Sequence, residues 1–98
     1  MNISIDFDET YTEDPQLWNA FIRAAQASGH TIYCVTARHN VSYETKEVLE
    51  SIGALIGEDK CIFTSRMGKR ATCFNRNINI HVWIDDTPDA IVAHIYTT

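Results

Sequence analysis

The chain has 98 residues, of which 45% are hydrophobic, and this length predicts a single domain over residues 1–98 with a small core. Its formal net charge of −5 argues against broad electrostatic binding to nucleic acid or to an anionic membrane. No apolar run reaches the length of a membrane span, and the first residues lack the features of a signal peptide. We therefore expect a cytoplasmic protein without membrane contacts.

The first third of the chain alternates between extended and helical patterns. Residues 3–7 are a short apolar run that predicts a buried strand. Asp14 and Pro15 are typical of the cap and first turn of a helix, which Gly29 is expected to stop. Residues 30–37 are rich in β-branched and aromatic side chains, and this composition favours a second strand.

The same alternation continues to the end of the chain. Ser42 is expected to cap a second helix, Tyr43 to lie on its apolar stripe, and Gly53 to end it. The remaining elements are expected to be a strand over 60–65, a helix over 68–77, a strand over 80–85, and a helical turn that finishes as an edge strand over 88–97.

Strands and helices in alternation predict an α/β, Rossmann-like three-layer fold with a mainly parallel sheet of four to five strands. In such sheets, ligands bind beyond the carboxyl ends of the strands. Polar residues follow each of the first four predicted strands, and we expect them to share one crevice. They are Asp6 and Asp8, then Thr36 and Arg38, then Ser65, Arg66 and Lys69, and finally Asp85 and Asp86.

Crowded carboxylates raise one another's pKa, and a bound Mg²⁺ relieves that repulsion because it prefers oxygen ligands. With a phosphate substrate, an aspartate could attack phosphorus, and a second acid two residues later could move the proton. A hydroxyl such as that of Thr36 and a cation would then hold the phosphoryl oxygens. Lys69 is the expected cation because it opens a helix, with Arg66 and Arg70 as alternatives.

Four short motifs match one known family. The stretch "DFDET" resembles the D-x-D-x-T motif of the haloacid dehalogenase (HAD) superfamily of Mg²⁺-dependent phosphatases. In the same order, "VTAR", "GKRA" and "IDDTPD" resemble its second, third and fourth motifs, so that the resemblance covers essentially the whole chain. In its short length and in the stretch "DFDETYTEDPQLW", the chain also resembles small HAD-type proteins encoded by bacteriophages.

The resemblance implies an enzyme, a phosphoric monoester hydrolase that works through an aspartyl-phosphate with Mg²⁺. Asp6 would be the nucleophile and a metal ligand. Asp8 would be the general acid/base, and its backbone carbonyl would contact the metal. Thr10 would stabilise the turn after the strand and would belong to the substrate-binding residues.

The other motifs supply the remaining roles that the resemblance implies. Thr36 would bind the phosphoryl group, and Lys69 would pair with the nucleophile and the transferring phosphate. Asp86 would ligate the metal directly while Asp85 helps through water or hydrogen bonds, although the two could exchange these roles. Arg38 would bind substrate, because a similar hydroxyl-x-Arg occurs in HAD phosphatases that act on nucleotides and nucleic-acid ends.

Two departures from the family pattern bear on the substrate. Glu9 stands where the common pattern has Gly, which is tolerable if its backbone keeps a negative φ, and it adds negative charge at the phosphate entrance. The chain also lacks the length for a cap domain. An open site suits a bulky substrate such as a nucleic-acid end or a phosphoprotein, or a homodimer in which a second subunit supplies a lid.

Two readings without turnover remain alternatives. The fold could be a catalytically weak module that binds nucleotides or phosphoproteins, or a switch in which a phosphorylated Asp6 changes a partner contact. The basic run "RMGKR" (66–70) would ordinarily be a solvated loop, and it is the one basic patch in the sequence that a nucleic acid could use.

Overall fold

The computed structural model describes residues 1–92 and contains a four-stranded parallel sheet between helices, which confirms the predicted α/β fold. The strand order is β3-β2-β1-β4, and all neighbouring pairs are parallel. The strands are β1 (Asn2–Ile5), β2 (Thr31–Thr36), β3 (Cys61–Phe63) and β4 (Val82–Ile84).

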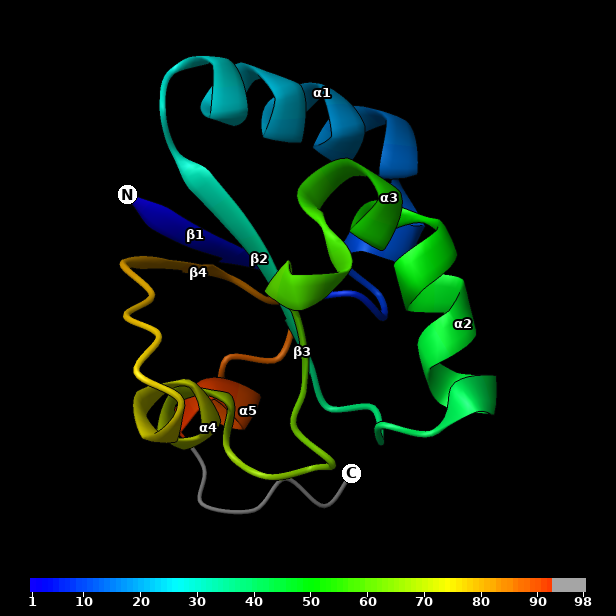
Figure 1. Cartoon of the computed structure of the whole chain (residues 1–98), viewed down its shortest axis with the longest axis vertical. Coiled ribbons are helices and arrows are strands. Elements are labelled where there is room, and N and C mark those ends of the chain that lie inside the picture. Colours follow the sequence, from blue (N-terminus) through cyan, green and yellow to red (C-terminus); the bar gives the residue numbers. More distant parts are fainter. Residues whose placement is uncertain (93–98) are drawn as a thin grey trace.

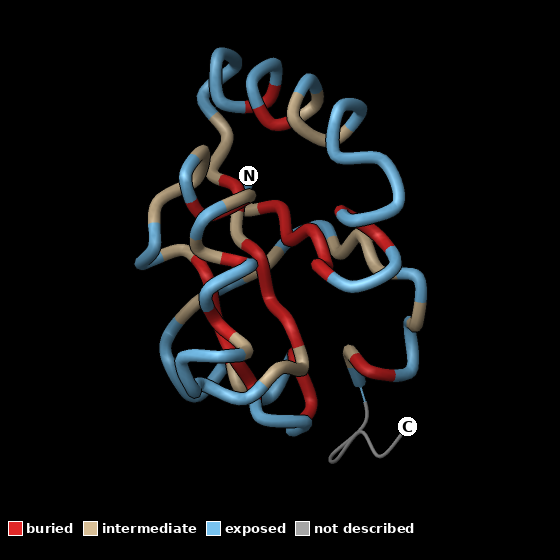
Figure 2. Tube along the Cα trace, turned by 90° about the vertical axis from the view of Figure 1, so that its right-hand side faces the viewer, coloured by how far each residue is buried: buried red, intermediate tan, exposed pale blue. Residues whose placement is uncertain are grey.

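Three helices pack on one face of the sheet and form the larger part of the core (Figure 1). Ile5 and Ile32 of the sheet, Ile22 and Val48 of these helices, and Phe7 after β1 are all fully buried in one cluster. Figure 2 shows that the buried residues lie mainly in the interior strands and on the inner sides of the helices. The helices are α1 (Pro15–Ala27), α2 (Ser42–Glu50) and α3 (Ile52–Ile56), with 3-10 turns at Tyr11–Glu13 and Glu58–Lys60.

The opposite face carries a smaller layer made of α4 (Lys69–Asn75) and α5 (Asp89–Val92) (Figure 1). Its core cluster joins Val35 and Ile62 of the sheet to Cys73 of α4. Partly buried hydrophobic side chains surround this cluster, among them Ile80 and Trp83. The expected finish of 88–97 as an edge strand falls mainly on residues 93–98, which lie outside the described residues.

Local signals explain several helix boundaries. The Asp14 carboxylate accepts the Leu17 backbone N–H at 3.1 Å, as expected of an N-cap, and Pro15 occupies the first turn of α1. Gly29, which follows α1, has φ +87°, a left-handed conformation that favours glycine. No helix within residues 1–92 is long and apolar enough to cross a membrane.

The predicted second helix is wrong in three details. Ser42 is its first residue and makes no capping hydrogen bond, because Val41 occupies the cap position in an extended conformation. Tyr43 is 85% exposed, so the apolar stripe begins later than predicted. The helix breaks at Ser51, and the chain continues through Gly53 as α3, until Gly57, with φ +98°, ends it.

The strand order places a switch point between β1 and β4. The chain builds β2 and β3 on one side of β1 and then crosses to add β4 on the other side. Loops that follow β1 and β4 therefore diverge at the carboxyl ends of these strands and leave room for a ligand between them. Asp6, Asp85 and Asp86 follow these two strands directly.

Candidate active site

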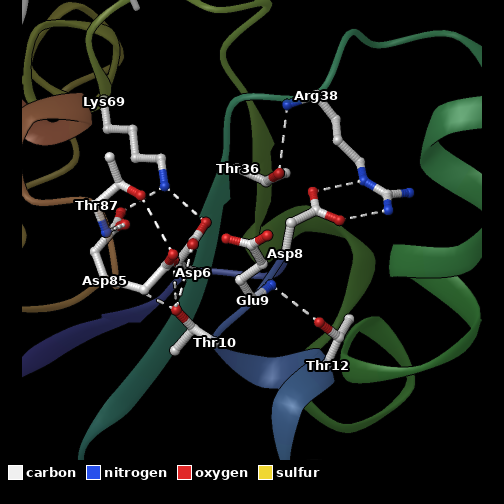
Figure 3. A network of polar contacts seen from close by, with 11 residues as sticks. Asp6, Asp8, Glu9, Thr10, Thr12, Thr36, Arg38, Lys69, Asp85 and Thr87 are labelled. Atoms are coloured by element: carbon white, nitrogen blue, oxygen red, sulfur yellow. Dashed lines mark hydrogen bonds and ion pairs between the residues drawn. The ribbon is translucent and has the colours of Figure 1, made fainter. Parts of the chain in front are cut away.

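Of the residues expected at the strand ends, all but Ser65 meet in one cavity of about 230 Å³. The backbone N–H of Asp6 donates to the Ile84 carbonyl at 2.9 Å, which extends the pairing of β1 with β4 by one residue and fixes the start of the loop. Figure 3 shows the polar side chains gathered at this end of the sheet. The lining comprises Asp6, Asp8, Glu9, Thr36, Ala37, Arg38, Arg66, Lys69, Asp85, Asp86, Thr87 and Ala90.

Lys69 bridges the first and last strands of the site. It is the first residue of α4 and only 2% exposed, and its Nζ donates to Asp6 Oδ1 at 2.7 Å and to Asp85 Oδ2 at 2.5 Å (Figure 3). Burial alone would lower the pKa of Lys69, but the two carboxylates outweigh burial and raise it, so the ammonium stays charged. Lys69 is thus the cation inside the site, whereas Arg66 lines the same cavity and Arg70 lines another.

The second oxygen of Asp6 shares a single hydroxyl with Asp86. Thr10 Oγ1 lies 3.3 Å from Asp6 Oδ2 and 3.0 Å from Asp86 Oδ1, and it accepts the Asp86 backbone N–H at 3.2 Å. Because a hydroxyl has only one hydrogen, it cannot satisfy both carboxylates at once. When both groups are ionised, one carboxylate oxygen is therefore short of a positive partner, and either a proton on Asp6 or a cation between Asp6 and Asp86 would supply it.

The donor set also fits a hard divalent cation. Asp6, Asp85 and Asp86 each offer one carboxylate oxygen, and these atoms lie within 4.8 Å of one another. Oxygen donors on adjoining strand ends are the ligands that Mg²⁺ prefers. The described residues therefore contain an acidic cluster that could hold a metal ion.

The two neighbouring aspartates after β4 differ in how far their oxygens are engaged. Asp85 Oδ2 accepts from Lys69, and Asp85 Oδ1 accepts the Thr87 backbone N–H at 2.9 Å. Asp86 is exposed, and its carboxylate oxygens accept from the hydroxyls of Thr10 and Thr87 rather than from a cation. Asp86 is therefore the better placed of the two to ligate an ion directly, while Asp85 holds Lys69.

Burial sets the proton affinity of the central carboxylate. Asp6 is 7% exposed, and burial raises its pKa to about 7, against the lowering effect of Lys69. Burial also acts to raise the pKa of Asp86, but hydrogen bonds from Asp6, Thr10 and Thr87 outweigh it and lower the pKa. Near pH 7, Asp6 of the metal-free site is thus only partly deprotonated, and a bound cation would displace the remaining proton.

Asp8 faces away from this cluster and forms a two-pronged ion pair with Arg38 (Figure 3). Arg38 Nε donates to Asp8 Oδ2 at 2.9 Å and Nη2 donates to Asp8 Oδ1 at 2.7 Å, so both carboxylate oxygens are engaged. The side chain of Asp8 is not among the carboxylates that cluster around the potential ion site. Its expected metal contact through the backbone carbonyl stays a prediction.

Further contacts fix the Arg38 guanidinium, and sequence reasoning missed them. Nη2 also donates to Glu47 Oε1 at 2.7 Å, Nη1 donates to the Glu44 carbonyl at 2.9 Å, and the guanidinium lies 4.9 Å above the Phe7 ring centre. Glu47 lies on α2 and approaches Arg38 only through the packing of that helix. No local pattern in the sequence identifies such a partner.

Glu9 adopts a left-handed backbone conformation that favours glycine. Its φ is +63°, so the negative φ that would make the side chain tolerable is not found. The turn is held by the Glu9 N–H, which donates to Thr12 Oγ1 at 3.0 Å, and by the Tyr11 N–H, which donates to the Asp6 carbonyl at 3.1 Å. A non-glycine residue in this region costs about 1–2 kcal/mol, so the turn is strained.

The loop between β3 and α4 is strained as well. Ser65 and Arg66 both have positive φ, +54° and +67°, and the Met67 N–H donates back to the Thr64 carbonyl at 3.0 Å. The Ser65 and Arg66 N–H groups donate to the carbonyls of Arg38 and Ala37, which tie this loop to the end of β2. The tie places Arg66 at the cavity.

No family model, curated protein or solved structure matches the chain. The HAD resemblance therefore rests on the sequence motifs.

Proposed function

We propose that this protein is a Mg²⁺-dependent phosphatase that hydrolyses a phosphomonoester through an aspartyl-phosphate on Asp6. One observation carries the proposal. A buried carboxylate at the switch point has one oxygen on Lys69, while its other oxygen shares a hydroxyl with Asp86. This arrangement supports a nucleophile held between a fixed cation and a potential metal site.

Asp6 and Asp86 would hold the ion, with Asp85 as an outer partner through its bond to Lys69. Bound there, Mg²⁺ would neutralise the carboxylates and let a phosphate dianion approach them. Lys69 would keep its charge beside the phosphoryl oxygens. Thr36 Oγ1 accepts the Arg38 backbone N–H at 3.3 Å, and no acceptor among the described residues takes its own hydrogen, which is left for a phosphoryl oxygen.

The reaction proceeds in two transfers at phosphorus. An oxygen of Asp6 forms a bond to phosphorus while the bond to the leaving oxygen breaks, and Asp8 gives that oxygen a proton. Water then attacks the phosphorus of phosphorylated Asp6 and passes its proton to Asp8. The bond between phosphorus and Asp6 breaks, which releases phosphate and restores both carboxyl groups.

Proton transfer by Asp8 requires that its ion pair with Arg38 open. Both oxygens of Asp8 accept from Arg38 in this structure, so neither is available to carry a proton to a leaving group. A substrate phosphate is a matching acceptor for the guanidinium fork. Substrate binding would thus transfer Arg38 from Asp8 to phosphate and release the acid for chemistry.

The test is phosphate release with Mg²⁺ from an aryl phosphate, mononucleotides, 3′- and 5′-phosphorylated oligonucleotides and a phosphopeptide. We expect release by the wild type, and a loss on the order of a thousandfold or more for Asp6→Asn. Asp59→Asn is the matched control, because Asp59 is an exposed aspartate that pairs with Lys60 and does not line the active-site cavity. If no substrate releases phosphate while calorimetry still shows Mg²⁺ binding, the phosphatase proposal is rejected.

The Asp8–Arg38 pair also favours a second candidate, a module that binds phosphorylated ligands without turnover. In that case Arg38 would stay on Asp8, and Glu9 would hinder attack at the entrance. Tight calorimetric binding of a nucleotide without phosphate release would support the module. Rapid turnover by the wild type would reject it.

A further inference from the structure

Charge is unevenly distributed along the chain. All 13 Asp and Glu residues lie outside residues 61–84. That stretch carries the exposed Arg66, Arg70 and Arg76, so the exposed surface of α4 and its flanking loops is locally basic in a protein of net charge −5, whereas Lys69 is buried against carboxylates. A polyanion would be repelled by most of the surface and attracted to this part.

A groove lies on this basic part of the molecule. It measures about 960 Å³ and runs between α4, the segment that leads into β4, and α5. Ile80 and Trp83 line it with apolar surface, and Phe74 of α4 is 79% exposed beside them. An aromatic ring exposed to this extent contributes little buried area to the stability of the fold and is available to contact an external partner.

The polar part of the lining is largely uncharged. Asn75, Asn77 and Asn79 supply amide donors and acceptors, and Arg70 supplies the positive charge. Exposed aromatic rings that stack on bases, amides that reach base edges and a cation for the backbone are the features of sites for single-stranded nucleic acid. A duplex hides its base faces, so a stacking surface selects single strands.

The groove adjoins the candidate active site through two pairs of consecutive residues. On α4, Lys69 lines the active-site cavity and Arg70 lines the groove. On α5, Ala90 lines the cavity and Ile91 lines the groove. A flexible strand in the groove therefore needs to cross only the contact between α4 and α5 to present its end to Asp6.

We propose that this groove binds single-stranded nucleic acid and directs its phosphorylated end to the active-site cavity. The fate of that end rests on the proposed phosphatase function, whereas binding in the groove does not. The groove also accounts for how a substrate overcomes the negative charge of Asp8 and Glu9 at the entrance. Contacts along the strand supply affinity that a free mononucleotide lacks.

The test measures fluorescence anisotropy of a labelled oligothymidylate of about twelve nucleotides, with and without a terminal phosphate, at several salt concentrations. We expect Phe74→Ala to weaken binding about fivefold or more, because a stacked base is lost. Arg70→Gln should weaken binding and reduce the slope of log K against log salt by about one. Arg23→Gln is the matched control, since it removes an exposed arginine from α1 on the other face of the sheet.

Hydrolysis supplies a second readout on the same proteins. We expect Phe74→Ala to lower the ratio of kcat/KM for a phosphorylated oligonucleotide to kcat/KM for an aryl phosphate, and Arg23→Gln to leave that ratio unchanged. The groove proposal would be overturned if no oligonucleotide bound at low salt, or if Phe74→Ala and Arg23→Gln bound it equally well. Either result is expected if the groove binds a peptide or a second copy of the chain instead. Aryl phosphate hydrolysis without oligonucleotide binding would refute the groove alone, and groove-dependent binding without any hydrolysis would refute the phosphatase alone.

Discussion

Replacement of Glu9 by glycine should stabilise the protein. Glu9 has φ +63°, which costs a residue with a Cβ atom about 1–2 kcal/mol. Glycine removes that strain but adds freedom to the unfolded chain, which offsets about 0.4–1 kcal/mol. The net gain is about 0.8 kcal/mol from the middle of the two ranges, which corresponds to a rise in Tm of roughly 3–6 °C for a chain of this size. The Glu9 N–H donates to Thr12 Oγ1 through the backbone, so this bond survives the substitution.

Glu9→Ala separates strain from charge in the same experiment. Alanine removes the carboxylate but keeps Cβ, so the strained φ persists. Urea denaturation in EDTA should rank Glu9→Gly above both the wild type and Glu9→Ala. If Glu9→Ala is as stable as Glu9→Gly, backbone strain at this position is not the cause and the reasoning fails.

The kinetic consequence should follow charge rather than backbone conformation. Glu9 lines the active-site cavity, so both variants remove a negative charge that faces an incoming phosphate. We expect both to lower KM for an aryl phosphate to a similar extent, and least so at high salt, where the charge is screened. A lower KM in the glycine variant alone would point to loop motion instead of electrostatics.

Three further predictions concern the charged centre of the site. Lys69→Met should destabilise the protein by about 3–5 kcal/mol in urea denaturation without metal, because it leaves the buried carboxylates of Asp6 and Asp85 without their cation. A loss of stability below about 1 kcal/mol would contradict a buried ion pair. In metal-free buffer, the folded pKa of Asp6 is about 7 against an ordinary 3.8, so the folded chain binds this proton more tightly than the unfolded chain does. The stability that Asp6 contributes is therefore complete below about pH 4 and is lost as pH rises toward 7, by at most about 1.4 kcal/mol per pH unit. The difference in free energy of unfolding between wild type and Asp6→Asn should follow this slope with pH. A difference that does not change with pH would refute the prediction. Mg²⁺ should raise the Tm of the wild type in proportion to the logarithm of the Mg²⁺ concentration, and Asp86→Asn should reduce that rise. Equal rises in the two proteins would show that Asp86 does not bind the metal.

The parallel sheet could be predicted because its signals are local. Short apolar runs, the Asp14 cap with Pro15, and Gly29 after the helix each act within a few residues. The grouping of Asp6 with Asp85 also follows from the sequence, since parallel strands end at one edge of a sheet. The position of Lys69 at the start of α4 follows for the same reason.

Other features depend on contacts between distant segments. The break at Ser51 and the exposure of Tyr43 reflect how α2 and α3 meet the sheet, which helical spacing alone does not determine. The pairing of Arg38 with Asp8 and Glu47 joins the end of β2 to the β1 loop and to α2. Side chains as long as arginine have several acceptors within reach, and only packing selects among them.

Strain and buried charge gather at the same end of the sheet. Of the four non-glycine residues with positive φ within residues 1–92, Glu9 and Arg66 line the active-site cavity and Ser65 precedes Arg66. The fourth, Asn77, follows α4, and asparagine tolerates this conformation readily. A fold under selection for stability alone would place glycine at such positions and would avoid a buried lysine. The local costs at this end therefore indicate that it is shaped for binding or chemistry, whichever reaction the experiments identify.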